Sequence, residues 1–280
     1  MAGIWARTAA GTLAAAGISI VARRYRALSR GGAAAAAVVG GITVGGAGWR
    51  GGSALVAFFV SSTLLGRLPG SRRIEQQRGN ERDAVQVLAN GGVASALALA
   101  AAMDGTRTNA VFRTGFGGAL AAAAADTWAT EIGSRSPRPP RSILTWQPVR
   151  RGASGGVTVA GLLASAAGAG LIAGCEASGL GQPWAARRAP FIAVTAGGFA
   201  GSVADSLLGA TVQAIRFCDT CGRETELRVH GCGAPTRHLR GLAWCDNDAV
   251  NLLATATGAV TAIAIAALLT EVGSRGSDDG

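Results

Sequence analysis

An uninterrupted stretch of glycine, alanine and leucine at residues 117–125 constrains the fold of this chain most strongly. Because it has no polar side chain, we expect it to form a helix that is buried in lipid or in protein. Two acids, Asp126 and Glu131, and two threonines follow within six residues. Ionisable groups are costly at the end of an apolar helix and generally serve a function there. The alternative is that Asp126 only marks the point where the helix leaves the membrane.

The composition is typical of a multi-pass helical membrane protein. The 280 residues are 49% hydrophobic and 15% charged, and 43 of them are glycine, whereas soluble domains contain about 25% charged residues. The basic residues are all arginine and give a net charge of +10. In a soluble protein this charge would suggest a nucleic-acid partner. Here the arginines lie in short loops between apolar segments, so we expect them to orient the chain and to contact lipid or phosphate, and we expect no nucleic-acid partner.

Long apolar segments predict an all-α, glycine- and alanine-rich fold with six to eight transmembrane helices in a single domain, residues 1–280. The segments are 4–22, 33–48, 51–66, 84–103, 109–131, 155–175, 189–213 and 248–270. A helix needs about 20 residues to cross the hydrocarbon core. The second and third segments are short and rich in glycine, so the alternative is one broken or re-entrant segment. Arginines follow the first segment, which favours a retained helix over a cleaved signal peptide.

The arginines also predict the orientation of the chain. Most of them fall in the loops after the first, third, fifth and seventh segments. Excess positive charge marks the cytoplasmic side of a membrane protein. We therefore expect these loops in the cytoplasm, both ends of the chain outside, and the protein in the cell membrane.

With this topology, polar clusters that are far apart in sequence converge on the cytoplasmic face. The clusters are Gln86, Asn90 and Gly91; Asp126 and Glu131; Gly155 and Gly156; Asp205; and Asp246, Asn247, Asp248 and Asn251. Carboxylates hold Mg²⁺ together with substrate phosphates, glycine-rich helix starts bind phosphate, and cations offset its charge. The pattern predicts phosphoryl transfer from a nucleotide triphosphate.

Within this candidate site we assign Mg²⁺ to Asp126 and Asp205, with Asp246 or Asp248 completing the site. Glu131 is also assigned to the site, but it would point away from Asp126 unless the helix ends or bends between them, and would then act indirectly. The asparagines, the glycines and Gln86 would bind substrate or nucleotide. The arginines just before Gln86, namely Arg72, Arg73, Arg78 and Arg82, would offset phosphate charge.

Each cluster also has a structural interpretation. The glycine pairs 91–92 and 155–156 could serve close helix packing alone. The arginines could be solvated loop charges. Asp246 or Asp248 could cap the last helix.

A weak internal repeat supports a site between two helical hairpins. Gly91-Gly92-Val93 followed by Asp126 is echoed by Gly155-Gly156-Val157 followed by Asp205. In each copy the predicted hairpin enters and leaves on the same side. Parallel repeats often frame a binding site at their interface.

Residues 214–245 form a cytoplasmic Cys/His loop between the last two helices. Cys218 and Cys221 are followed by His230 and Cys232, a set typical of a structural zinc site. His238 is a substitute fourth ligand, and Cys245 is a spare thiol. A disulfide is disfavoured in the reducing cytoplasm, so the alternative is a loop of unligated cysteines.

Several of these motifs together resemble the integral membrane family of transmembrane protein 19. The motifs are residues 58–62, 86–91, 125–133, 155–158, 205–211 and 246–251, in an order and spacing that fit roughly the whole chain. The family includes a plant phytyl-phosphate kinase. The resemblance therefore implies an isoprenoid monophosphate kinase, with CTP as the expected donor and Asn90, Asp126, Glu131, Asp205, Asp246 and Asn247 at motif positions.

The alternative function is a transporter or flippase of a polar or phosphorylated lipid. In that case the same aspartates would form an ion site between the repeats. The sequence gives no basis for an oligomeric state.

Overall fold

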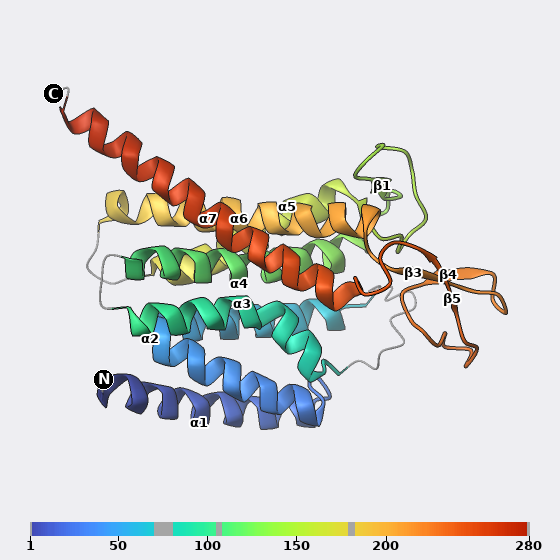
Figure 1. Ribbon diagram of the computed structural model, residues 1–280, viewed down its shortest axis with the longest axis horizontal. Helices are drawn as coiled ribbons and strands as arrows, with labels where there is room; N and C mark the ends of the chain where they lie inside the picture. The colour runs from blue at the N-terminus through green and yellow to red at the C-terminus, as the bar shows by residue number, and fades with distance from the viewer. Residues whose placement is uncertain (1, 70–80, 105–107, 179–182, 279–280) are drawn as a thin grey trace.

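In the computed structural model, the described residues 2–69, 81–104, 108–178 and 183–278 form seven α-helices and two small sheets. The helices are α1 (Ala2–Arg24), α2 (Arg30–Arg67), α3 (Ala84–Met103), α4 (Thr108–Gly133), α5 (Val159–Ala177), α6 (Trp184–Thr211) and α7 (Asn247–Asp278). They run lengthwise through the molecule (Figure 1). The predicted all-α membrane fold is confirmed.

The helix α4 lies at the centre of this bundle. It contacts α2, α3, α5, α6 and α7, and all side chains from Gly115 to Ala125 are buried. The other six helices are long and apolar enough to cross a membrane, whereas α4 does not reach that level of hydropathy. Because other helices surround α4 and separate it from lipid, its side chains can be small and its hydropathy can be low.

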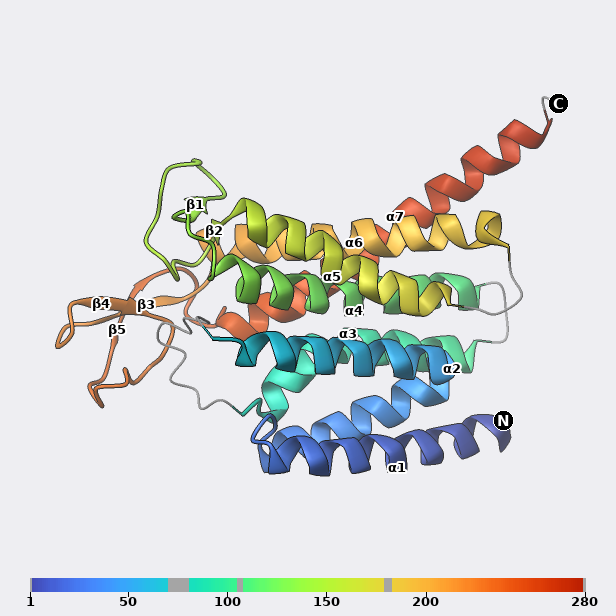
Figure 2. The same cartoon turned by 180° about the vertical axis from the view of Figure 1, so that it is seen from behind.

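The helix α2 is broken at Gly48. This residue has φ +72° and ψ −170°, which is outside the helical region and in a range that glycine adopts without strain. The two halves of α2 therefore run in opposite directions, as Figures 1 and 2 show. They correspond to the predicted segments 33–48 and 51–66.

Glycines bring three helices into backbone contact. A Cβ atom on Gly258 of α7 would lie 2.6 Å from the carbonyl oxygen of Gly118 in α4. A Cβ atom on Gly197 of α6 would lie 2.6 Å from the carbonyl oxygen of Gly258. The expected role of small residues in close helix packing is thus seen where α4, α6 and α7 meet.

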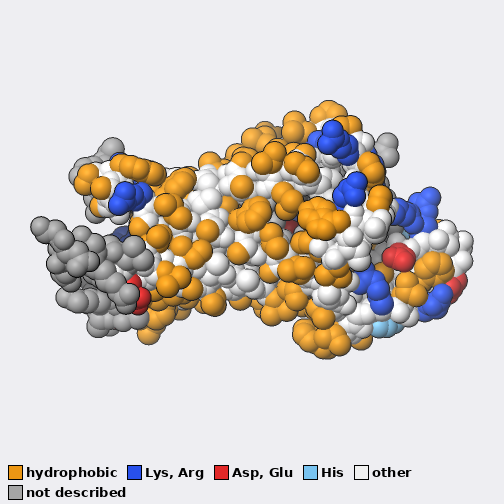
Figure 3. All heavy atoms as spheres, turned by 90° about the horizontal axis from the view of Figure 1, so that it is seen from above, with side chains coloured by type: hydrophobic (Ala, Val, Ile, Leu, Met, Phe, Trp, Pro, Cys, Tyr) orange, Lys and Arg blue, Asp and Glu red, His pale blue; other side chains and the backbone are white. Residues whose placement is uncertain are grey.

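The loops that are rich in arginine gather at one end of the bundle, which we call the arginine-rich end. It carries residues 25–29, 134–158 and 212–246 (Figure 1, right). Seen from above, hydrophobic side chains cover the middle of the molecule, and charged side chains gather at this end (Figure 3). The topology prediction depends on loops that are alternately rich and poor in arginine, and the grouping of the rich loops agrees with it.

Two antiparallel sheets that were not predicted also lie at the arginine-rich end. The strands β1 (Arg141–Ser142) and β2 (Gly156–Val157) form one of them. The strands β3 (Ile215–Cys218), β4 (Arg223–Thr225) and β5 (Arg237–Arg240) form the other, in the order β4-β3-β5. The segment predicted as a Cys/His loop therefore contains a small sheet.

The prediction that a helix starts at residue 155 is wrong. Gly155 has φ +79°, Gly156 belongs to β2, and α5 starts only at Val159. The Thr158 hydroxyl caps α5 by accepting a hydrogen bond from the Gly161 amide at 3.0 Å. Since Gly91 and Gly92 lie within α3, the two glycine pairs are not equivalent. The hairpins α3–α4 and α5–α6 do run in the same sense, with Asp126 and Asp205 in their second helices.

Candidate functional site

A cavity of about 1060 Å³ collects most of the predicted site residues at the arginine-rich end. Those that line it are Gln86, Asn90, Gly91, Asp126, Glu131, Gly155, Gly156, Asp205, Asp246, Asn247 and Asn251. Asp248 is buried and is not among the lining residues. Arg72, Arg73 and Arg78 lie outside the described residues. The fold thus brings together side chains from α3, α4, α6, α7 and the 150–158 loop.

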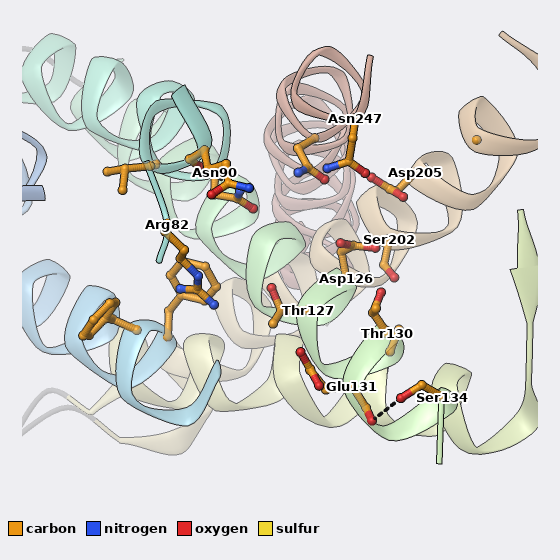
Figure 4. A pocket seen from close by; sticks show the side chains of 18 of the residues that line it. Arg82, Asn90, Asp126, Thr127, Thr130, Glu131, Ser134, Ser202, Asp205 and Asn247 are labelled. Atoms are coloured by element: carbon orange, nitrogen blue, oxygen red, sulfur yellow. Dashed lines mark hydrogen bonds between the residues drawn. The ribbon is translucent and has the colours of Figure 1, made fainter. Parts of the chain in front are cut away.

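Two aspartates on neighbouring helices line the polar part of the cavity. Asp126 of α4 and Asp205 of α6 both line the cavity, and their carboxyl groups lie near one another (Figure 4). One oxygen of Asp205 is buried and has no hydrogen-bond donor among the described residues. Two carboxylates in this position repel unless a proton or a cation lies between them. The pair therefore suits a bound cation or a shared proton.

A third carboxylate, that of Glu226, approaches the pair from the segment after β4. Glu226 lines the cavity and is close enough for its charge to act on Asp205. The Ser154 hydroxyl donates to a Glu226 carboxylate oxygen at 3.0 Å and so joins this segment to the 150–158 loop. Glu226 was not predicted as a site residue, because the sequence around an acid in a polar loop does not indicate which residues it contacts.

Glu131 has a different environment from Asp126. Its carboxylate lies 3.5 Å from the Arg135 guanidinium, and both side chains are largely buried. Arg135 also donates to the carbonyl oxygens of Leu65 and Leu68, at 2.6 and 3.0 Å. Glu131 therefore helps to fasten the end of α4 to the end of α2, in keeping with the expected indirect role.

Several predicted binding residues also serve as helix caps. The Asp246 carboxylate accepts hydrogen bonds from the amides of Asp248 and Ala249, both at 3.1 Å, and so caps α7. Gln86 forms a capping box with Asp83 at the start of α3. Of the two alternatives for a further acid at the site, the structure favours Asp246, because Asp248 does not line the cavity.

Asparagines and arginines complete the polar lining. Asn247 and Asn251 lie one turn apart on α7, and Asn247 points toward Asp205 (Figure 4). Arg82 lines the cavity and lies over the Phe58 ring at 5.8 Å. Arg150 and Arg151 also line it, although sequence reasoning did not select them.

The cavity continues into an apolar groove between α1 and the two halves of α2. Its lining there includes Ala15 and Ile18 of α1 and Val39, Val56 and Phe59 of α2. Ile18 and Val56 are both partly exposed. The cavity is therefore polar at the arginine-rich end and apolar along α1 and α2.

Comparison with known proteins identifies the family. The sequence profile of the family described as integral membrane protein DUF92 matches residues 13–259. The chain belongs to this family. This DUF92 protein is thus an integral multi-pass membrane protein, and the family expected from its motifs is confirmed.

Two relatives show how far the similarity extends. Protein PGR of Arabidopsis thaliana is 34% identical over 230 residues, which cover 74% of this chain and 78% of that protein. The uncharacterized membrane protein MJ0933 of Methanocaldococcus jannaschii is 31% identical over 196 residues, which cover 69% of this chain and 78% of that protein. No solved structure matches this DUF92 chain.

The DUF92 chain carries a second cluster of ligand side chains beside the cavity. The ligand atoms of Cys218, Cys221, His230 and Cys232 all lie within 4.8 Å of one another. It is the one cluster of three or more histidine, cysteine and acidic ligands with metal-site spacing in the described part of the chain. Contact with His230 lowers the pKa of the Cys232 thiol to about 6.

The two substitute ligands considered from the sequence are not members of this cluster. Cys245 is fully buried just before α7, and burial followed by the charge of Asp246 raises the pKa of its thiol. His238 lies on β5 and is exposed.

Proposed function

We propose that this DUF92 protein is an isoprenoid monophosphate kinase that transfers phosphate from a nucleotide triphosphate, with Mg²⁺, at the arginine-rich end. The observation that carries the proposal is the Asp126–Asp205 pair at the head of a cavity that continues into an apolar groove. We place the protein in the cell membrane with this end in the cytoplasm, where nucleotides are available.

The shape of the cavity supports an amphiphilic substrate. A prenyl or phytyl chain would lie along Ile18, Val56 and Phe59 and keep its phosphate beside the acids. The motif resemblance to a family that includes a plant phytyl-phosphate kinase supports the same substrate class. CTP is the expected donor on that resemblance.

The reaction requires positioning and charge neutralisation more than acid–base chemistry. An oxygen of the isoprenoid phosphate would attack the γ-phosphorus, and the bond from this phosphorus to the β–γ bridging oxygen would break, so that the nucleoside diphosphate leaves with the electron pair. The acceptor is already largely dianionic near neutral pH, since the second pKa of a phosphate monoester is about 6. The chain therefore needs no general base for this step.

Asp126 and Asp205 would hold Mg²⁺, which when bound neutralises charge on the nucleotide phosphates. The buried Asp205 oxygen without a donor fits this role. Arg82 and Arg150 would supply positive charge to the phosphates, and Asn247 would orient Asp205.

The alternative is a transporter or flippase of a polar or phosphorylated lipid. The observation that favours it is the position of the two aspartates on matching helices of the hairpins α3–α4 and α5–α6. An acid pair between parallel repeats could bind a coupling proton or ion.

Reconstituted vesicles distinguish the two functions. Vesicles with this protein should convert phytyl or geranylgeranyl phosphate to the diphosphate with γ-labelled CTP, ATP or GTP, and a short water-soluble alkyl phosphate should be a poor acceptor. The kinase proposal fails if no nucleotide supports transfer. Ion-dependent translocation of a labelled lipid that disappears in Asp126→Asn would then establish the transporter.

A further inference from the structure

We propose that Cys218, Cys221, His230 and Cys232 bind one zinc ion, which holds the three-stranded sheet in place as a wall of the cavity. This inference is independent of the proposed transfer reaction, because none of the four side chains lines the cavity. It gives the Cys/His segment a role in the architecture of the site.

The distances within the cluster suit tetrahedral zinc. A tetrahedron with Zn–S bonds of about 2.3 Å has sulfur–sulfur edges of about 3.8 Å. The Sγ atoms of Cys218 and Cys232 are 3.7 Å apart, and His230 Nδ1 lies 3.2 Å from the Cys232 sulfur. A disulfide would need sulfurs about 2.05 Å apart, and all five cysteines are free.

The backbone presents the ligands on two tight turns. The Gly222 amide donates to the Cys218 carbonyl at 2.9 Å, and Gly222 has φ +63°. The Gly233 amide donates to the His230 carbonyl at 2.8 Å, and Gly233 has φ +83°. In each case a glycine in the left-handed region follows the second ligand, so that both ligands of a turn face the same point.

The sheet has little apolar packing of its own. Its strands have three or four residues, and its buried side chains are few: Ile215, Cys218, Thr225, His230 and Thr236. A sheet of this size generally requires a metal, a disulfide or a covering element. A four-ligand zinc would join the β3–β4 turn to the segment that leads into β5.

The metal would act on the cavity through residues next to its ligands. Phe217 precedes Cys218, Gly222 follows Cys221, and both line the cavity, as does Glu226. Fixing the sheet would therefore fix the position of Glu226 relative to Asp205. The ion itself would remain structural, since four protein ligands leave no open position.

Metal analysis of the purified, full-length protein in detergent tests the proposal. We expect about one zinc per chain, and at least a tenfold lower content in Cys218→Ser and Cys221→Ser. Cys245→Ser and Cys175→Ser serve as matched controls that should keep the metal. Freshly reduced, monodisperse wild-type protein without zinc would overturn the proposal, and so would zinc content that the Cys218 and Cys221 variants leave unchanged.

A measurement on the wild-type chain keeps the test decisive if the variants do not fold. Protein grown with cobalt should show the visible absorption of tetrahedral cobalt bound to thiolates, which octahedral cobalt lacks. Chelation should then accelerate amide hydrogen exchange in β3–β5 by tenfold or more and leave α4 and α6 unchanged. Absence of the cobalt signal, or exchange that is insensitive to chelation, would contradict the assignment.

Discussion

Two aspartates that lie near one another at the arginine-rich end of membrane helices are stable only when their charge is offset. Asp126 and Asp205 are in this position, with Glu226 nearby. The aspartates could be predicted from the sequence because each interrupts an apolar helix. Glu226 and Arg150 could not be predicted as site residues, because they lie in polar loops and only the tertiary fold brings them to the cavity.

Replacement of either aspartate by asparagine should separate activity from stability. Asp126→Asn and Asp205→Asn should each lower phosphoryl transfer by roughly a hundredfold or more, because the charge that holds Mg²⁺ is lost. The midpoint of thermal unfolding should stay the same or rise, because a repulsion is removed. Asp104→Asn, at the opposite end of the bundle, is the control for the transfer assay. Variants that keep near wild-type transfer would show that the site is elsewhere.

Arg135 fastens the end of α4, and its loss should destabilise the protein. Arg135→Ala leaves the buried Glu131 carboxylate without this salt bridge and removes the bonds to Leu65 and Leu68. We expect a loss of roughly 2 kcal/mol in the free energy of unfolding. Thermal unfolding in detergent measures it, and Glu131→Gln added to Arg135→Ala should recover part of the loss. Equal stability of Arg135→Ala and wild type would refute this role.

At the scale of helices and strands, an element can be predicted from the sequence when it is long and mainly apolar. The helix from Ala84 to Met103 was predicted residue for residue, since it is mainly apolar and starts with a cap. The start of α5 was misplaced, because a left-handed Gly155 and the Thr158 cap override an apolar pattern. The strands β3–β5 were missed, because segments of three or four residues carry too little periodicity.

The contact of α4, α6 and α7 at Gly258 should tolerate no larger residue. In Gly258→Ala the new methyl carbon would lie 2.6 Å from the Gly118 carbonyl oxygen and 2.7 Å from the Ala122 Cβ, and neither can move without its helix. We expect a loss of roughly 1–3 kcal/mol. Gly170→Ala on α5, where a Cβ meets nothing within 4 Å, should be neutral or stabilising. Similar unfolding midpoints for the two variants would contradict this packing.

At the scale of the whole molecule, charged side chains are distributed unevenly along the long axis of the bundle. The arginine-rich end carries the polar part of the cavity and both sheets, while hydrophobic side chains cover the middle (Figure 3). This polarity could be predicted by following the arginines along the chain. The shape of the cavity could not, because it depends on how the two halves of α2 diverge from Gly48.

The absence of lysine from the sequence offers a direct test of orientation. Single Arg138→Lys and Arg188→Lys variants introduce an exposed amine at opposite ends of the bundle. A membrane-impermeant amine reagent applied to intact cells should label Lys at 188 above the wild-type background, and Lys at 138 only after permeabilisation. The reverse pattern would invert the proposed topology.

The apolar groove between α1 and α2 has a kinetic consequence for a lipid substrate. A substrate that enters through Ile18 and Val56 would come from the plane of the bilayer and never pass through bulk water. Its supply would be set by its mole fraction in the membrane and by lateral diffusion in two dimensions. Turnover would then fall when inert lipid or detergent dilutes the surface, even if the total amount of substrate in the sample stays constant.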